Sequence, residues 1–343
     1  MLMSIASEAE FKRMADMIRR DDPALRTVLL EADGRYATRT IRFDILMREV
    51  IACLAEGFRC RSTDDLPTLY CAWGKARVGS TALANMFGFA GMTSYYQPVK
   101  AIMRQRLKGE AGVPLILPPT SANPCAFSKE TAGPYMLAEC LMIPFEALVE
   151  AGYPADKLSL IVLDREPLSS LASWIDRLTC RIPESVLVRH YVLSALNKIR
   201  VENYAQRLGV PVTHYVHEAS KEPVASARAL FARLGLSHLF NEHAVTNWNE
   251  ARQLETGNAK VIFPTEPQIY DVPGLHGSGT AYQYRAGGAL SAENREIIER
   301  FGIDEVYRES AQACAHDLRM SAAMAARLFE TEASTTRHLE VAE

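Results

Sequence analysis

The sequence lacks the features that mark several large classes of protein. Its seven cysteines are odd in number, scattered and without a CxxC pair, so neither a disulfide framework nor a zinc ribbon is predicted. No apolar run approaches the roughly 18 residues of a membrane-spanning helix. The 38 Lys and Arg residues nearly balance the 41 Asp and Glu residues, whereas a dedicated nucleic-acid binder carries a basic excess. We therefore expect a cytoplasmic protein with reduced thiols that spans no membrane and binds no nucleic acid.

The order of apolar segments indicates the fold class. Up to about residue 60, apolar residues recur at three- and four-residue spacing, which predicts a helical extension over 1–62. Beyond it, short apolar runs alternate with longer helical segments, which is typical of an α/β domain with a parallel sheet, here 63–330. A polar tail over 331–343 is expected to be mobile. The expected strands are 68–73, 124–128, 158–163 and 211–216, and the expected helices are 81–89, 135–151, 168–178, 220–236, 291–300 and 304–328.

The loop between the first strand and its helix has the composition of an anion site. It reads GKARVGST, from Gly74 to Thr81. A loop at this place can turn backbone N–H groups and a helix N-terminus toward a phosphate. Charge comes from Lys75 and Arg77, and hydroxyls come from Ser80 and Thr81. A glycine-containing surface turn without a ligand is the alternative for this segment taken alone.

The same loop departs from the nucleoside-triphosphate P-loop, G-x-x-x-x-G-K-[ST]. Gly74, Gly79 and Thr81 match that pattern, but Ser80 stands where the lysine that contacts the β- and γ-phosphates would be. The loop can therefore hold a phosphate but lacks the lysine used in γ-phosphoryl transfer.

A second anion site is predicted after the apolar run at 158–163. Arg165 follows the end of that strand, and Ser173 lies eight residues later on the next helix. An arginine offers a planar fork of donors to a phosphate. Ligands of open α/β sheets bind beyond the carboxyl ends of the strands, where both anion segments fall. The alternative is that Arg165 pairs with its neighbours Asp164 or Glu166.

Together the two segments resemble the sulfotransferases that use 3′-phosphoadenosine-5′-phosphosulfate (PAPS). The family's 5′-phosphosulfate loop, [R/K]-x-G-[S/T]-T-x-L, is matched by RVGSTAL at 77–83. Its 3′-phosphate motif, R-[D/E/N]-P with a serine eight residues after the arginine, is matched by REP at 165–167 and Ser173. The segment RAGG at 285–288 is similar to a late loop of the family that returns to the 3′-phosphate, with Ala286 where lysine is common. The resemblance implies a P-loop-NTPase-like three-layer sandwich with a central, mainly parallel sheet.

The resemblance also implies a set of site residues and a reaction. The reaction is metal-independent transfer of a sulfuryl group from PAPS to a hydroxyl or amine of an acceptor, leaving 3′,5′-bisphosphoadenosine (PAP). Arg77 would neutralise the charge that develops on the leaving phosphate, and Lys129 would stabilise the transferring group. The residues implied to hold the nucleotide are Lys75, Arg77, Val78, Gly79, Ser80 and Thr81 at the 5′ end, and Arg165, Ser173 and Arg285 at the 3′ end.

The general base is not given by any matched motif. Many relatives use a histidine near Lys129, but the sequence has none between residues 74 and 189. Glu130, a carboxylate beside that lysine, is our first choice, with His190, His214 and His217 in reserve. A solvated Lys129–Glu130 pair without a catalytic role is the alternative.

Two other functions stay open from the sequence. One is a P-loop-like nucleotide kinase, and the other is a nucleotide-binding protein that has lost its chemistry. The acceptor could be a small molecule, a glycan or a lipid. Residues 1–62 could belong to the acceptor site or to an interface in a homo-oligomer.

Overall fold

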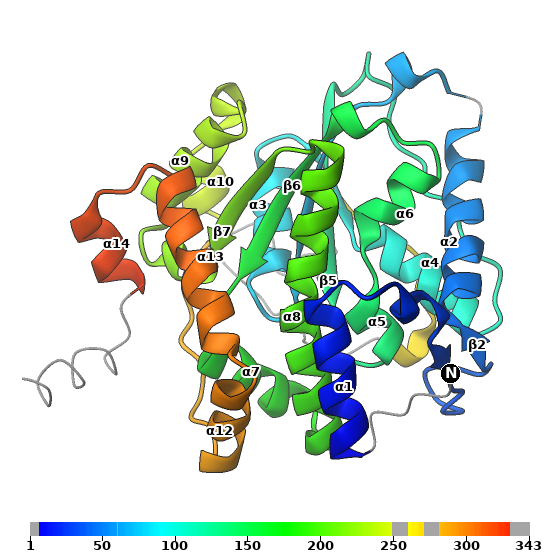
Figure 1. Ribbon diagram of the computed structural model, residues 1–343. Helices are drawn as coiled ribbons and strands as arrows, with labels where there is room; N and C mark the ends of the chain where they lie inside the picture. Colours follow the sequence, from blue (N-terminus) through cyan, green and yellow to red (C-terminus); the bar gives the residue numbers. More distant parts are fainter. Residues whose placement is uncertain (1–6, 60, 249–259, 271–280, 330–343) are drawn as a thin grey trace, which may run out of the picture.

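A six-stranded sheet forms the centre of the computed structural model, which describes residues 7–59, 61–248, 260–270 and 281–329 (Figure 1). The strand order is β7-β6-β3-β5-β4-β8, and every neighbouring pair is parallel. The tail at 331–343 lies outside the described residues. The sheet strands are β3 (Thr68–Lys75), β4 (Thr93–Tyr96), β5 (Cys125–Ala132), β6 (Leu158–Asp164), β7 (Val212–Val216) and β8 (Val261–Ile262).

Helices connect the strands and cover both faces of the sheet, giving three layers (Figure 1). The expected α/β class and parallel sheet are thus confirmed. The α-helices are α1 (Glu8–Arg19), α2 (Phe43–Phe58), α3 (Ser80–Phe89), α4 (Pro98–Leu107), α5 (Leu137–Leu141), α6 (Pro144–Glu150), α7 (Pro167–Leu178), α8 (Glu184–Leu208), α9 (Pro223–Arg233), α10 (His243–Thr246), α12 (Ala292–Arg300), α13 (Ile303–Asp317) and α14 (Ala322–Phe329).

The central strand β3 is buried on both faces. Because successive side chains of a strand point to opposite faces, Leu69, Cys71 and Trp73 enter the core on one side, and Tyr70 and Ala72 enter the core on the other. This explains why the strand reads as a continuous apolar run rather than an alternating one.

The helices of the N-terminal extension belong to the larger of these two cores. The first helix, α1, packs against the long helix α8, and α2 packs against α4. The ring of Phe11 on α1 lies 4.8 Å from that of Phe301, between α12 and α13. A short antiparallel ribbon that the sequence did not predict joins the two N-terminal helices, formed by β1 (Leu29–Leu30) and β2 (Ile41–Arg42).

The helix expected over 135–151 is two shorter helices. Proline disfavours the helical conformation in the residue before it, and Ile143, directly before Pro144, is accordingly extended at φ −113°, ψ 96°. Helix α5 therefore ends before this point and α6 begins at the proline, which occupies the first helical position.

A histidine clamp ties the edge strand β7 to two helices. The ring of His214 lies 2.9 Å (Nδ1) from Asp317 Oδ2 on α13 and 3.0 Å (Nε2) from Glu202 Oε1 on α8. Burial alone would lower the pKa of His214, but the two carboxylates outweigh it and raise the pKa to about 9. The imidazolium is therefore the stable form at neutral pH.

We expect the stability that His214 contributes to be lost in alkaline solution. Its pKa is higher in the folded than in the unfolded chain, so the contribution is complete below about pH 6.5 and disappears as the pH rises through about 9. Urea unfolding between pH 6 and 10 gives the free energy of unfolding of the wild type and of His214→Asn. The difference between the two proteins should shrink by about 2 kcal/mol over this range. If the difference between the two proteins does not change with pH over this range, the raised pKa assigned to His214 is contradicted.

Candidate functional site

The loop between β3 and α3 turns back on itself through two residues with positive φ. Arg77 has φ +70° and Gly79 has φ +79°, directly before α3 begins at Ser80. A Cβ on Gly79 would lie 2.6 Å from His217 Nδ1, so both conformation and space require glycine here. The turn leaves the N-terminus of α3, with its partial positive charge, at the carboxyl edge of the sheet.

The predicted anion segments line one cavity of about 730 Å³ at this edge. The segments at Arg77 and Arg165 meet because β3 and β6 are neighbours. The segment at Arg285, 120 residues after Arg165, reaches the same cavity and accepts a hydrogen bond from Arg165. The structure thus brings together the predicted residues Arg77, Gly79, Ser80, Thr81, Arg165, Ser173 and Arg285.

Arg165 joins three of these segments. It follows β6 and is 6% exposed. Its two terminal nitrogens donate to backbone carbonyls, at 3.0 Å to Arg77 O and 2.8 Å to Arg285 O. Its Nε has no hydrogen-bond partner among the described residues. Glu166, one alternative partner for this arginine, instead accepts hydrogen bonds from the first N–H groups of α7.

Positive charge is concentrated along this cavity. Arg77 Nε donates to Ser173 Oγ at 3.1 Å. Burial lowers the pKa of Arg77, and the nearby Arg165 lowers it further. Among the described residues, two acidic side chains line the same cavity, but Asp176 pairs with Arg177 and Glu184 accepts a hydrogen bond from Asn294. The arrangement favours an anionic ligand, which would relieve the repulsion between the arginines.

His217 also lines the larger cavity. Burial lowers its pKa to about 3, and Arg165 adds to the shift, so the ring is neutral. Its Nδ1 has no hydrogen-bond partner among the described residues. Of the three reserve bases, this is the one beside the anion segments. His190 is buried with Nδ1 2.6 Å from Pro134 O, and His214 is held in the clamp described above.

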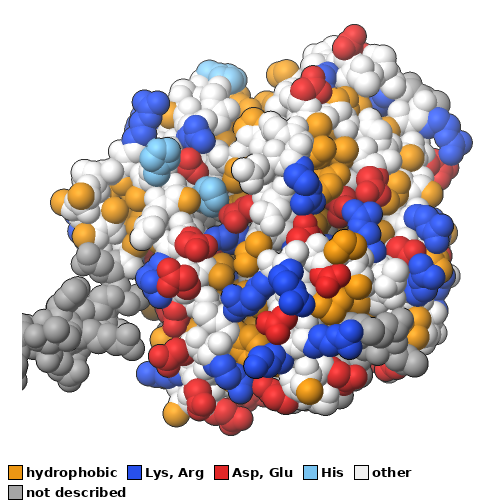
Figure 2. All heavy atoms as spheres, viewed as in Figure 1, with side chains coloured by type: hydrophobic (Ala, Val, Ile, Leu, Met, Phe, Trp, Pro, Cys, Tyr) orange, Lys and Arg blue, Asp and Glu red, His pale blue; other side chains and the backbone are white. Residues whose placement is uncertain are grey.

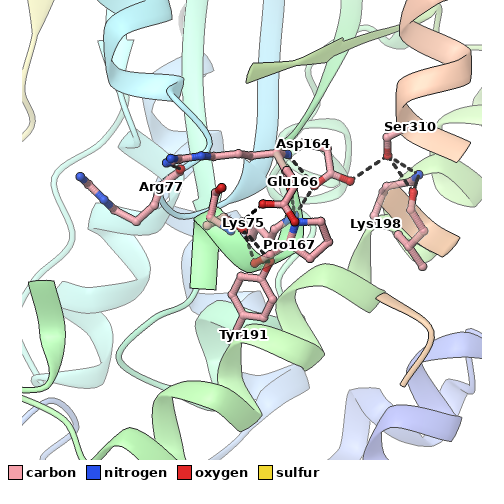
Figure 3. Close-up of polar contacts among 12 residues, drawn as sticks. Lys75, Arg77, Asp164, Glu166, Pro167, Tyr191, Lys198 and Ser310 are labelled. Atoms are coloured by element: carbon pink, nitrogen blue, oxygen red, sulfur yellow. Dashed lines mark hydrogen bonds and ion pairs between the residues drawn. The ribbon is translucent and has the colours of Figure 1, made fainter. Parts of the chain in front are cut away.

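Lys75 and Val78 are not among the residues that line the larger cavity. Lys75 is 3% exposed and forms an ion pair with Asp164 at the end of β6 (Figure 3). Asp164 also accepts from Ser310 Oγ at 2.8 Å, and Ser310 accepts from Lys198 Nζ at 2.7 Å. Arg77 points away from this buried network. The ammonium group of Lys75 is therefore paired between two strand ends and does not line the cavity. The side chain of Val78 is buried in the core.

A smaller cavity of about 240 Å³ adjoins the larger one, and Arg77, Ser80 and Thr81 line both. Lys129 enters it from β5. Its Nζ lies 3.2 Å from Gln97 Oε1 and 3.6 Å from the centre of the Tyr96 ring. Burial and the neighbouring Lys100 lower the pKa of Lys129 well below the ordinary lysine value.

Glu130 lies on the opposite face of β5 from Lys129. Its Oε1 accepts from Val99 N at 2.9 Å and its Oε2 from Lys100 N at 3.3 Å, so the carboxylate caps the N-terminus of α4. It lines neither cavity. The expectation that Glu130 is the general base is therefore not supported, because adjacent residues of a strand point to opposite faces.

Sequence reasoning missed most of the smaller cavity. Glu266 is the carboxylate that lines it among the described residues. Its Oε1 accepts from Gln97 Nε2 at 2.8 Å and its Oε2 pairs with Arg104 at 2.5 Å. No local motif marks the missed part of the lining, which includes residues of β4, α4, β5 and α7, Gln97 before α4, the segment after β5 and segment 263–270. Thr131, two residues after Lys129, could have been found from strand alternation.

The face of the molecule shown in Figure 2 carries both positive and negative side chains. Lys and Arg side chains are interspersed with Asp and Glu side chains on this face. Ion pairs between charged side chains in the described part of the chain include Arg300 with Glu8 and Arg207 with Asp21.

Comparisons of the chain with protein-family models, with curated proteins and with solved structures found no match. Within the described ranges, no helix is both long and apolar enough to cross a membrane. No group of three or more His, Cys, Asp or Glu side chains in that part of the chain is placed to hold a metal ion.

Replacing Lys75 should damage stability rather than ligand binding alone. Lys75→Met leaves Asp164 as a buried carboxylate without its ammonium partner, which costs about 3–5 kcal/mol in comparable cases. The double variant Lys75→Met/Asp164→Asn should recover part of that loss, because the uncompensated charge is gone. Urea unfolding of the two variants checks this. A wild-type-like Lys75→Met protein would show that the pair does not stabilise the fold.

Proposed function

We propose that this chain transfers a sulfuryl group from PAPS to an acceptor. One observation carries the proposal: three segments recognised separately in the sequence, around Arg77, Arg165 and Arg285, line one cavity at the carboxyl edge of a parallel sheet. The place of the loop, between the central strand β3 and α3, supports a P-loop-like fold.

We assign a separate set of groups in the cavity to each phosphate of PAPS. The N-terminus of α3, with the hydroxyls of Ser80 and Thr81 and the guanidinium of Arg77, would hold the 5′-phosphosulfate. Arg165, Ser173 and the loop at 285–288 would hold the 3′-phosphate. Arg165 Nε, which is buried without a partner among the described residues, is a donor available to that phosphate.

The chemical step requires little more than positioning and charge. The acceptor oxygen bonds to sulfur while the bond between sulfur and the bridging phosphate oxygen breaks, and PAP leaves with both electrons of that bond. A loose transition state of this kind is stabilised mainly by fixed cations and helix dipoles. Arg77 lines both cavities and would neutralise the leaving oxygen, and Lys129 would approach the sulfuryl group from the acceptor side.

The acceptor's proton needs a base within the smaller cavity. Burial would raise the pKa of Glu266, but Arg104 and Gln97 outweigh burial and hold it below the ordinary value, so the carboxylate is ionised at neutral pH. We assign it the proton that the acceptor hydroxyl releases. A weak base suffices where the proton leaves late in a loose transfer.

The same residues argue against a kinase that needs Mg²⁺. A P-loop enzyme of that kind uses the lysine that Ser80 replaces, and an acidic strand end to hold the metal. Asp164 is an acidic strand end, but Lys75 already neutralises it from within the protein.

Ligand-dependent melting tests the nucleotide. PAPS and PAP should raise the melting temperature by several degrees, whereas ATP with Mg²⁺ should raise it less. Arg165→Ala should weaken PAP binding about 30- to 150-fold, as expected for charged hydrogen bonds worth about 2–3 kcal/mol. Arg308→Ala removes an exposed arginine outside both cavities and serves as the matched control. Stabilisation by ATP with Mg²⁺ but not by PAP would overturn the proposal.

Two carboxylate variants test the base. Glu266→Gln keeps the shape of the side chain and should lower kcat at least about 100-fold while PAP affinity stays within about threefold. Glu130→Gln should leave kcat within about tenfold, because that carboxylate caps a helix. Single-turnover rates and PAP calorimetry on both proteins give the comparison. If Glu130→Gln lowers kcat strongly and Glu266→Gln does not, Glu130 is the general base and the assignment to Glu266 is wrong.

A further inference from the structure

The smaller cavity has features that restrict which acceptor it can take, and the inference below rests on the proposed sulfuryl transfer. Its volume of about 240 Å³ lies under the roughly 300–1,000 Å³ of pockets for drug-sized ligands. It meets the larger cavity at Arg77, Ser80 and Thr81, so a molecule bound in it would present an atom to the end of the phosphosulfate.

Flat apolar surfaces form much of its wall. The rings of Tyr96 and Phe263 are stacked with their centres 4.6 Å apart, and those of Tyr135 and Tyr270 meet edge-on at 5.5 Å. Three prolines complete this lining: Pro134, Pro264 and Pro267. Walls of this shape suit one flat ring and leave little room for a chain of rings.

The charges in the cavity disfavour a further cation. Lys100, Arg104 and Lys129 all line it, against the single lining carboxylate Glu266 in the described segments. Glu139, behind the cavity, pairs with Lys100 at 3.4 Å and Arg104 at 2.7 Å. Arg77 also lines the cavity. An ammonium group entering here would face that guanidinium, whereas a hydroxyl carries no charge into the site.

One polar atom of the wall has its hydrogen-bonding capacity unused. The hydroxyl of Tyr135 is buried without a partner among the described residues, and its ring lines the cavity. A buried hydroxyl without a partner is costly unless a ligand or water satisfies it. Tyr36 is a natural comparison, because its hydroxyl is also buried without a described partner and its ring lies 4.8 Å from Tyr135, yet it lines neither cavity.

From these observations we infer that the acceptor is a compact molecule with a single ring whose nucleophile is a hydroxyl and not an amine, and that Tyr135 hydrogen-bonds a second polar group on that ring. The ring lies in the smaller cavity, with the reacting hydroxyl toward Lys129 and Arg77. Cationic acceptors, and glycans or lipids that need more than one ring or a long chain inside the cavity, are excluded by this assignment.

Matched pairs of small rings test the choice of nucleophile. The full chain, saturated with PAP, is titrated by calorimetry or protein NMR with cyclohexanol and cyclohexylamine, 4-methylphenol and benzylamine, and D-glucose and D-glucosamine. At least one hydroxyl member should bind, and its amine counterpart should bind at least about tenfold more weakly. Equal or tighter binding of the amine overturns the inference, as does failure of all three hydroxyl compounds to bind.

Two tyrosine variants test the contact. Tyr135→Phe should weaken the hydroxyl compound that binds about fivefold to tenfold, as for one lost hydrogen bond of about 1 kcal/mol. Tyr36→Phe should not change its affinity. Neither protein should melt below the wild type, since each variant removes a buried hydroxyl that makes no described hydrogen bond. If Tyr135→Phe and Tyr36→Phe bind the hydroxyl compound with equal affinity, the proposed contact with Tyr135 is overturned.

The response to PAP separates this inference from the proposed function. If PAP stabilises the wild type and both tyrosine variants, the nucleotide site stands whatever the rings do, and a negative result with the rings overturns the acceptor class alone. If PAP stabilises none of them, the proposed function fails first.

Discussion

The buried ion pair between Lys75 and Asp164 is the interaction on which the site depends. It joins the carboxyl ends of β3 and β6, the two strands that carry the anion segments, and Ser310 extends it to α13. A charge buried this deeply is tolerated when it is paired and hydrogen-bonded, so the pair fixes the relative positions of the two strand ends. Arg77 and Arg165, each one or two residues beyond the pair, are thereby aimed into one cavity.

The parts of the fold that the sequence predicts are those encoded locally. Strands β3 and β6 are continuous apolar runs, and each is followed by a short motif, so their place and the larger cavity could be inferred. Helix α8 could not, because it is buried on most sides and includes polar residues such as Lys198 and Arg200. Its apolar residues form no stripe, and several partners of its polar residues, such as Ser310 for Lys198 and Asp21 for Arg200, lie far away in the sequence.

The smaller cavity shows the same limit at the level of single residues. Lys129 and Glu130 are adjacent in the sequence, and the sequence alone does not show which of the two side chains faces the cavity. The pairing of β5 with β3 and β4 decides it and turns Glu130 toward α4. Glu266 comes from a segment more than 130 residues later and carries no motif, so only the assembled fold reveals it.

The contacts between α1 and Phe301, which lies between α12 and α13, have a consequence for synthesis. Arg19 on α1 donates to the carbonyl of Phe301, 282 residues away in the sequence, and Phe11 packs on the ring of the same residue. At roughly 5–20 residues per second, a ribosome needs on the order of tens of seconds to make the chain between them. Throughout that time the apolar face of α1 lacks its contact with Phe301. The nascent chain is therefore more prone to misassembly than the finished protein.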